Sequence, residues 1–205
     1  MTTNPFPPPC TPAEVIASRS GLYHLLSRLW IREVDEKLLS QLLSSPLCES
    51  FTEAGGILPT SQNVSESVEQ LAIEYCRLFV GPTGHLPPCQ SVWQEGQFQG
   101  SMIGSMENFC AAVDYDTSLL GGRNMKDHLG IQLDVMGHIL DLLSQPTHQD
   151  ESQPDLLAFA ETFYQTHLTW ATKLFAAVSQ KTTTDFYRSV VLLTQQFLAS
   201  EAAPN

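Results

Sequence analysis

The sequence predicts an all-α protein: a single helical domain of about seven helices, in an N-terminal and a C-terminal part joined by a hinge. Apolar residues recur at three- and four-residue spacing along every long segment, which is the period of an amphipathic helix. No segment alternates apolar and polar residues for long enough to predict a strand. The chain has 205 residues and is 42% hydrophobic, which is enough to bury one sizeable core.

The N-terminal part is predicted to span residues 11 to about 113, after a proline-rich tail over residues 1–10. A capping box from Thr11 to Glu14, with proline at the first helical position, opens the first helix. A second helix covers about 35–44. Breaks at Gly55, Gly56 and Pro59 predict a loop over 46–63.

The third helix is predicted from Asn63, a capping residue, to Val80, where Gly81-Pro82 ends it. Residues 82–100 are rich in glycine and proline and are expected to form a loop that presents Trp93. A fourth helix is predicted over about 101–113.

The C-terminal part is predicted to span about 125–199, after a hinge at about 114–124 that contains Gly121-Gly122. The segment 124–143 is apolar around most of its circumference, which is typical of a buried central helix. After a polar loop over 144–154, one helix is predicted from Pro154 to about Val178 and another from Thr184 to about Phe197. Residues 200–205 are expected to form a short tail.

The net charge of −12 comes from 22 acidic and 10 basic residues. Such a surface repels nucleic acid and favours a basic partner. The first residues show no secretory signal, and no window has the apolar length of a membrane span. Five dispersed cysteines without a C-x-x-C pair are typical of a reducing compartment. We therefore expect a cytoplasmic protein without stable membrane insertion.

Apolar and aromatic residues around the end of the third helix are the main candidate site. They are predicted to form a shaped groove for a basic, apolar peptide. Its members are Tyr75, Leu78, Phe79, Pro88 and Trp93.

Asp127 and His128 have two interpretations. They can form a polar or acid–base pair at a groove. Alternatively, Asp127 favours the positive end of the central helix while His128 packs inside with one hydrogen bond. Neighbours on a helix do not face each other, so a direct relay between the two is not expected.

An enzymatic alternative is a metal-dependent hydrolase that uses Asp127, His128, Asp134 and His138. Asp134, His138 and Asp141 share one side of a helix at i, i+4 and i+7, a spacing that metal ligands can adopt. Helical two-metal sites use a Glu-x-x-His pair from each of two helices, and the sequence has none. We therefore predict no metal and no resident cofactor.

A nucleophilic cysteine is the second enzymatic alternative, with His85 as the only base near Cys89. Motifs for phosphate binding and for a serine nucleophile are absent from the sequence. We therefore predict that the protein is not an enzyme.

Two motifs resemble the TorD/DmsD/NarJ family of cytoplasmic chaperones for molybdoenzymes exported by the twin-arginine route. The first runs from Glu74-Tyr75 through Leu78 to Pro82 and continues with Pro87-Pro88 and Ser91-Val92-Trp93. The second is Met125-Lys126-Asp127-His128-Leu129-Gly130, followed by Leu133 and Met136. A looser match includes Phe163, His167, Trp170 and Phe175.

The resemblance implies binding of a twin-arginine leader on a molybdoenzyme catalytic subunit, which delays export until the cofactor is inserted. It assigns leader binding to a set of residues on both motifs, and it implies a monomer or a homodimer that exchanges parts through the hinge. Cys89 departs from the family, which has an aromatic residue there. The residues assigned to the leader are Tyr75, Leu78, Phe79, Pro88, Trp93, Asp127 and His128.

Overall fold

The computed structural model describes residues 11–60, 63–120, 124–145 and 153–202. Within these residues the fold is all-α and contains no strand; the single β-bridge joins Cys89 and His128. The predicted fold class is therefore confirmed. In the same residues, no helix has the length and apolar composition needed to cross a bilayer.

The first helices begin at the predicted caps. Thr11 and Glu14 form the capping box of α1 (Pro12–Ile31), and Asp35 caps α2 (Glu36–Leu42) by accepting the Leu38 N–H at 2.8 Å. Asn63 caps α4 (Val64–Tyr75), which continues as a π-helix, Cys76–Val80, and ends at Gly81. A capping side chain satisfies an N–H that the helix leaves free, so these starts are set locally by sequence.

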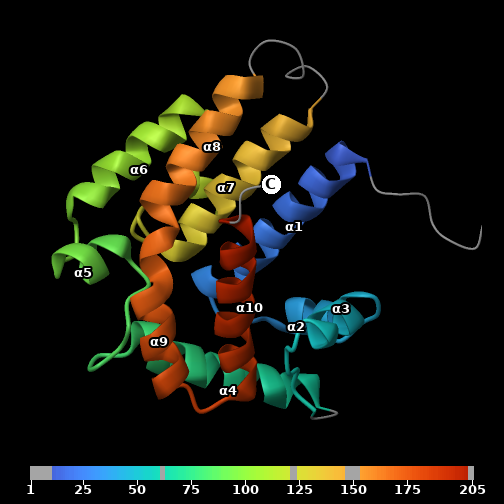
Figure 1. The fold of residues 1–205 in the computed structure, drawn as a ribbon. Coiled ribbons are helices and arrows are strands. Elements are labelled where there is room, and N and C mark those ends of the chain that lie inside the picture. The colour runs from blue at the N-terminus through green and yellow to red at the C-terminus, as the bar shows by residue number, and fades with distance from the viewer. Residues whose placement is uncertain (1–10, 61–62, 121–123, 146–152, 203–205) are drawn as a thin grey trace, which may run out of the picture.

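The centre of the fold is the packing of α1 against α7 (Leu129–Ser144), with α8 (Gln153–His167) on the far side of α7 (Figure 1). Two glycines of α7 allow this close approach. A Cβ atom at Gly130 would lie 2.9 Å from Ile31 Cβ, and one at Gly137 would lie 2.8 Å from the His24 ring. Eleven of the sixteen α7 residues are buried, which agrees with the apolar pattern of the segment.

The C-terminal helices complete the core. A short 3₁₀ turn, Thr169–Ala171, leads into α9 (Thr172–Lys181), and Thr184 caps α10 (Asp185–Glu201). Trp30 of α1 packs against Phe79 and Phe175, with ring centroids 5.5 and 5.7 Å apart, and its Nε1 donates to Thr194 Oγ1 at 2.9 Å. One core therefore joins the residues before and after the predicted hinge.

Four predicted boundaries are wrong. The segment 46–63 contains α3 (Leu47–Glu53), and 82–100 contains α5 (Gln90–Glu95). The helix predicted from Pro154 to Val178 is two helices, and the one predicted from Asn124 begins at Leu129. The first two errors have a common cause, because short helices between proline and glycine residues leave no full apolar period to read.

The hinge prediction is only partly covered by the described residues. Thr117–Leu120 form a 3₁₀ turn within it, and α6 (Ser101–Ala112) precedes it. Gly121 and Gly122 lie outside the described residues. Exchange of parts through this segment stays a prediction.

Candidate functional site

The three candidate residues of the third helix are part of the core. Tyr75, Leu78 and Phe79 are 5%, 0% and 7% exposed. The Tyr75 hydroxyl donates to Trp30 O at 3.1 Å, and the Tyr75 and Phe79 ring centroids are 5.1 Å apart. These three side chains therefore pack in the core and do not line an open groove, and their part in binding a peptide stays a prediction.

The same helix end positions the loop that follows it. Leu86 N–H donates to Leu78 O at 2.6 Å. Burial opposes ionisation of Glu74, but hydrogen bonds from Arg77, the Thr183 N–H and Thr182 outweigh it and lower the pKa of Glu74 to about 2. Glu74 therefore ties this helix to the start of α10 as an ionised group.

The two sequence motifs meet at what we call the motif junction, residues 88–91 and 127–129. Leu129 N–H donates to Pro88 O at 2.7 Å, and Gln90 N–H donates to Asp127 O at 3.0 Å. These bonds form the antiparallel bridge between Cys89 and His128. The structure thus brings Pro88, Asp127 and His128 together, although 36 residues separate Ser91 from Asp127 along the chain.

Asp127 and His128 each cap a different helix. Cys89 is the N-cap residue of α5, but its side chain makes no capping hydrogen bond. Asp127, from the second motif, makes that bond instead: its Oδ2 accepts the Ser91 N–H at 2.8 Å. His128 is the N-cap of α7, and its Nδ1 accepts the Gly130 N–H at 3.0 Å. A carboxylate at a helix N-terminus is also favoured by the helix dipole.

Of the two interpretations of this pair, the geometry fits the one in which Asp127 lies at a helix N-terminus and His128 packs inside. The helix that Asp127 caps differs from the predicted one. Asp127 serves α5 and not the central helix. Burial lowers the pKa of His128 to about 4, so the imidazole is neutral near pH 7 with its proton on Nε2. Asp127 Oδ1 and Ser91 Oγ are buried and have no hydrogen-bond partner within the described structure.

A buried polar network extends inward from the junction. Gln90 Oε1 accepts from Gln132 Nε2 at 2.7 Å and from His167 Nδ1 at 2.8 Å, and Gln90 Nε2 donates to Thr166 O at 2.7 Å. Burial lowers the pKa of His167 to about 4, so the ring is neutral near pH 7. Because its Nδ1 donates to Gln90, its Nε2 is the acceptor for the Ser105 hydroxyl at 2.9 Å.

This network fixes α5 against three other helices, because Ser105 is on α6, Gln132 on α7 and His167 on α8. Gln90, Gln132 and His167 are each 0% exposed. Sequence reasoning missed both glutamines. The sequence did contain one signal, because Gln132 is an uncharged polar residue within a run of apolar ones. A polar side chain in a buried helix needs hydrogen-bond partners, so Gln132 indicated a buried polar network.

Trp93 is the one predicted residue of this set with appreciable exposure. It lies on α5 and not in a loop, its ring is partly buried, and its Nε1 donates to Pro87 O at 2.8 Å. The other six predicted residues are buried. Trp93, two residues beyond the motif junction, is therefore the member of this set that a client could contact directly.

The residues of the metal alternative have other partners. Asp134 bonds His24 Nδ1 at 2.7 Å and the Tyr115 hydroxyl, and His138 Nε2 donates to Val113 O at 3.0 Å. Asp141 bonds His24 Nε2 at 3.1 Å. Hydrogen bonding to Asp134, which outweighs burial, raises the pKa of His24 to about 9. Over the described ranges, no group of three or more His, Cys, Asp or Glu side chains could hold a metal ion.

The cysteine alternative also lacks the geometry it needs. Cys89 is 5% exposed, and burial, with the charge of Asp127, raises the pKa of its thiol to about 12. A thiolate nucleophile needs a lowered pKa. Cys89 is therefore a small core residue at the junction.

Comparison with known proteins gives a family match over most of the chain. A family model described as "Nitrate reductase delta subunit" matches residues 36–176. "Chaperone protein TorD" of Shewanella sp. (strain ANA-3) is 28% identical over 138 residues, which cover 60% of this chain and 66% of that protein. The protein of the same name from Shewanella pealeana is 24% identical over 207 aligned positions, covering 90% and 88%. The match to the first relative thus spans just under two thirds of its length.

Proposed function

The chain belongs to the nitrate reductase delta subunit family, the TorD/NarJ family, and on that premise we propose that it is a cytoplasmic chaperone for a molybdopterin oxidoreductase precursor. It binds the twin-arginine leader of the catalytic subunit, assists cofactor insertion and delays export until folding is complete. The family model is named for a nitrate reductase delta subunit, and the similar proteins are named as chaperones.

The observation that carries this proposal is the family match, which contains both motifs and the junction they form. The charge supports it as well. A leader with paired arginines and an apolar stretch is attracted by a chain with a net charge of −12. Within the junction, the unpartnered Oδ1 of Asp127 is an acceptor that a donor from the client could satisfy if α5 moved slightly.

The test is co-purification of a tagged copy from the native cell, followed by identification of the bound precursor. We expect a molybdoenzyme precursor that keeps its leader. Calorimetry with the corresponding leader peptide then measures binding, and Trp93→Ala should weaken it. Recovery of mature enzymes only, or of no oxidoreductase, would contradict the proposal.

A second candidate function is an assembly factor that recognises the folded body of the client and ignores the leader. The burial of six of the seven predicted leader-binding residues favours this version. Deleting the leader from the client separates the two. Unchanged binding supports the assembly factor, and lost binding supports leader recognition.

A further inference from the structure

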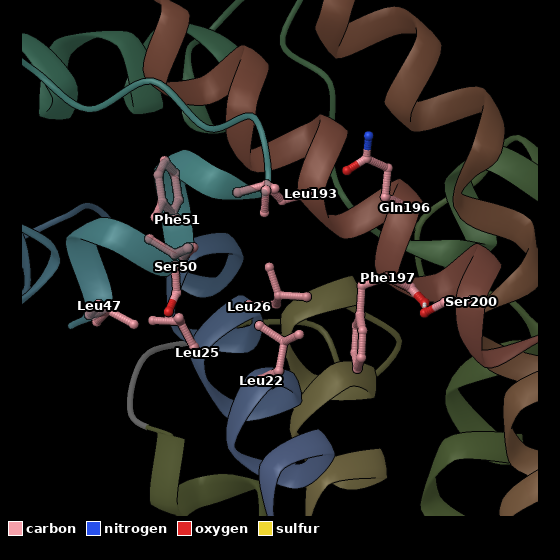
Figure 2. A pocket seen from close by; sticks show the side chains of 12 residues that line it. Leu22, Leu25, Leu26, Leu47, Ser50, Phe51, Leu193, Gln196, Phe197 and Ser200 are labelled. Atoms are coloured by element: carbon pink, nitrogen blue, oxygen red, sulfur yellow. Dashed lines mark hydrogen bonds between the residues drawn. The ribbon is translucent and has the colours of Figure 1, made fainter. Parts of the chain in front are cut away.

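An apolar groove lies away from the motif junction, between α1, α3 and α10. Figure 2 shows side chains from these three helices converging on it, and no residue of the junction is among them. Its volume is about 360 Å³, within the size range of ligand-binding clefts. The groove is lined by Leu22, Leu25, Leu26, Leu29, Leu47, Ser50, Phe51, Ala54, Leu193, Gln196, Phe197 and Ser200.

The walls of the groove are held in place before any partner arrives. The Phe51 ring packs against Gly56, where an added Cβ would lie 2.3 Å from the ring, and it stacks on Phe186 at 6.2 Å. The Phe197 ring meets Tyr23 edge to face at 4.7 Å. A preformed apolar groove binds without the cost of ordering its own side chains.

The floor is core, but the rim is open to solvent. Leu26 and Leu29 are 2% and 1% exposed, whereas Leu22 is 38% exposed. Leu25, Leu193 and Phe197 are partly exposed. Adjacent exposed apolar side chains around a concave surface mark an interaction site more often than scattered ones do.

The charges beside the groove are acidic and uncompensated. No lining residue is charged. Glu49 and Glu53 of α3 flank Ser50 and Ala54, are exposed, and form no salt bridge within the described part of the chain. The arginines of α1 and α10 are already paired: Arg19 with Glu201 at 2.7 Å, Arg28 with Asp35 at 2.6 Å, and Arg188 with Asp185.

We propose that this groove binds the apolar stretch of a basic peptide while Glu49 and Glu53 attract the positive charges beside that stretch. The inference rests on the proposed function, and its occupant is the leader of the client precursor. A second copy of the chain fits poorly, because both surfaces would carry a net charge of −12 and the same acidic rim.

The division of roles follows from the geometry. The apolar part of the leader docks between α1, α3 and α10. Trp93, two residues beyond the motif junction, is free to contact another part of the client. A single leader or precursor can therefore be held at two places, and linking two weak contacts raises the overall affinity.

The test uses a fluorescently labelled synthetic peptide with two arginines followed by a leucine- and alanine-rich stretch, titrated with the full chain. Leu22→Ser and Leu193→Ser each remove an apolar anchor from the groove, and we expect each to weaken binding about tenfold or more. Leu157→Ser is the matched control, because Leu157 is 51% exposed and lies on α8, outside the groove. It should bind as the unsubstituted chain does.

The charge component is tested separately. Glu49→Gln combined with Glu53→Gln should weaken binding less, and only at low salt, since exposed charges are screened at high ionic strength. The same peptide with its arginines replaced by glutamine should show no difference between this variant and the unsubstituted chain.

Three outcomes would overturn the inference, and they separate it from the proposed function. If the groove variants bind normally and Trp93→Ala abolishes binding, the leader is recognised elsewhere and the chaperone proposal stands. If Leu157→Ser weakens binding as much as Leu22→Ser, the groove is not specific. If the peptide fails to bind but the tagged chain still retains a precursor, the groove proposal fails and body recognition remains. Circular dichroism and the urea midpoint of each variant check folding.

Discussion

The motif junction and the apolar groove are built in opposite ways. In the junction and the buried network beside it, polar groups are removed from water and most are hydrogen-bonded to one another; Gln90 of the junction and His167 of the network are both 0% exposed. In the groove, leucine and phenylalanine side chains are left in contact with water. A buried cap or amide accepts few substitutes, whereas many apolar side chains can line a groove. The difference teaches that the recognisable motifs mark the internal framework, while a binding surface can lack a motif.

The largest loss of stability should come from acid, and it tests whether His128 of the junction and His167 of the adjoining network are neutral in the folded chain. A histidine in the unfolded chain has a pKa near 6.5, whereas burial in the folded chain lowers the pKa of His128 and of His167 to about 4. The unfolded state therefore gains protons first, and stability falls as the pH drops from 6.5 toward 4. Each histidine should contribute a loss of roughly 3 kcal/mol at most. Urea unfolding at several pH values between 6.5 and 4 measures this loss in the free energy of unfolding.

The control for the acid prediction is His128→Asn, because asparagine can cap α7 and does not titrate. Its unfolding free energy should depend less steeply on pH between 6.5 and 4 than that of the unsubstituted chain. An identical pH dependence would show that His128 is not buried in its neutral form, and the contrast between the junction and the groove would weaken.

The next largest effect tests the buried network directly. Gln90→Leu removes the acceptor for Gln132 Nε2 and His167 Nδ1 and leaves two buried donors unpaired. We expect a loss of about 2–4 kcal/mol in the free energy of unfolding. Gln41→Leu, at an exposed glutamine of α2, should change it by less than about 0.5 kcal/mol. Equal effects for the two variants would mean that the network does not hold α5 in place.

The sequence predicted the parts of the fold that depend on local signals. Caps at Thr11, Asn63 and Thr184 start helices where expected, and the apolar run of 124–143 became the buried helix α7. It could not predict α3 or α5, because each is short and lies among proline and glycine residues that hide the apolar period of a helix. Nor could it predict that Asp127 caps α5, since that contact depends on how the chain folds back.

For the candidate site, the sequence predicted that the two motifs act together, but it did not predict that most of their side chains are buried. The sequence associated the proline loop with Asp127 and His128, and the structure brings them into direct hydrogen bonding. It could not show that Tyr75, Leu78 and Phe79 face inward, because an amphipathic stripe has the same pattern whether it meets core or client. The groove could not be predicted from the sequence, because its lining residues come from three helices that are separated along the chain.

A smaller effect concerns α1, which carries one wall of the groove and also contacts α7 through His24. Asp134 and Asp141 bond the two ring nitrogens of His24; the Tyr115 hydroxyl in turn bonds Asp134, and Ser20 bonds Asp141. Because the folded pKa of His24 is raised to about 9, its contribution is complete below pH 6.5 and is lost as the pH rises through 9. Since His24 is partly exposed, we expect only about 1 kcal/mol. Urea unfolding of His24→Gln should show a flatter pH dependence over 6.5–9; an unchanged slope would contradict the raised pKa.

The smallest effect on the free energy of unfolding should come from the rim of the groove. A comparison of one rim residue with one floor residue tests whether the rim serves a partner or the core. Leu22 is exposed, so Leu22→Ser removes little buried area and should change the free energy of unfolding by less than about 0.5 kcal/mol. Leu26→Ala, one turn along on the buried floor, should cost about 2–5 kcal/mol. Urea unfolding of both variants gives the contrast. If Leu22→Ser is nearly neutral for folding yet weakens peptide binding, the rim leucine serves a partner and not the core. If it destabilises the chain as strongly as Leu26→Ala does, the groove is part of the core, and its open rim is no evidence of a binding site.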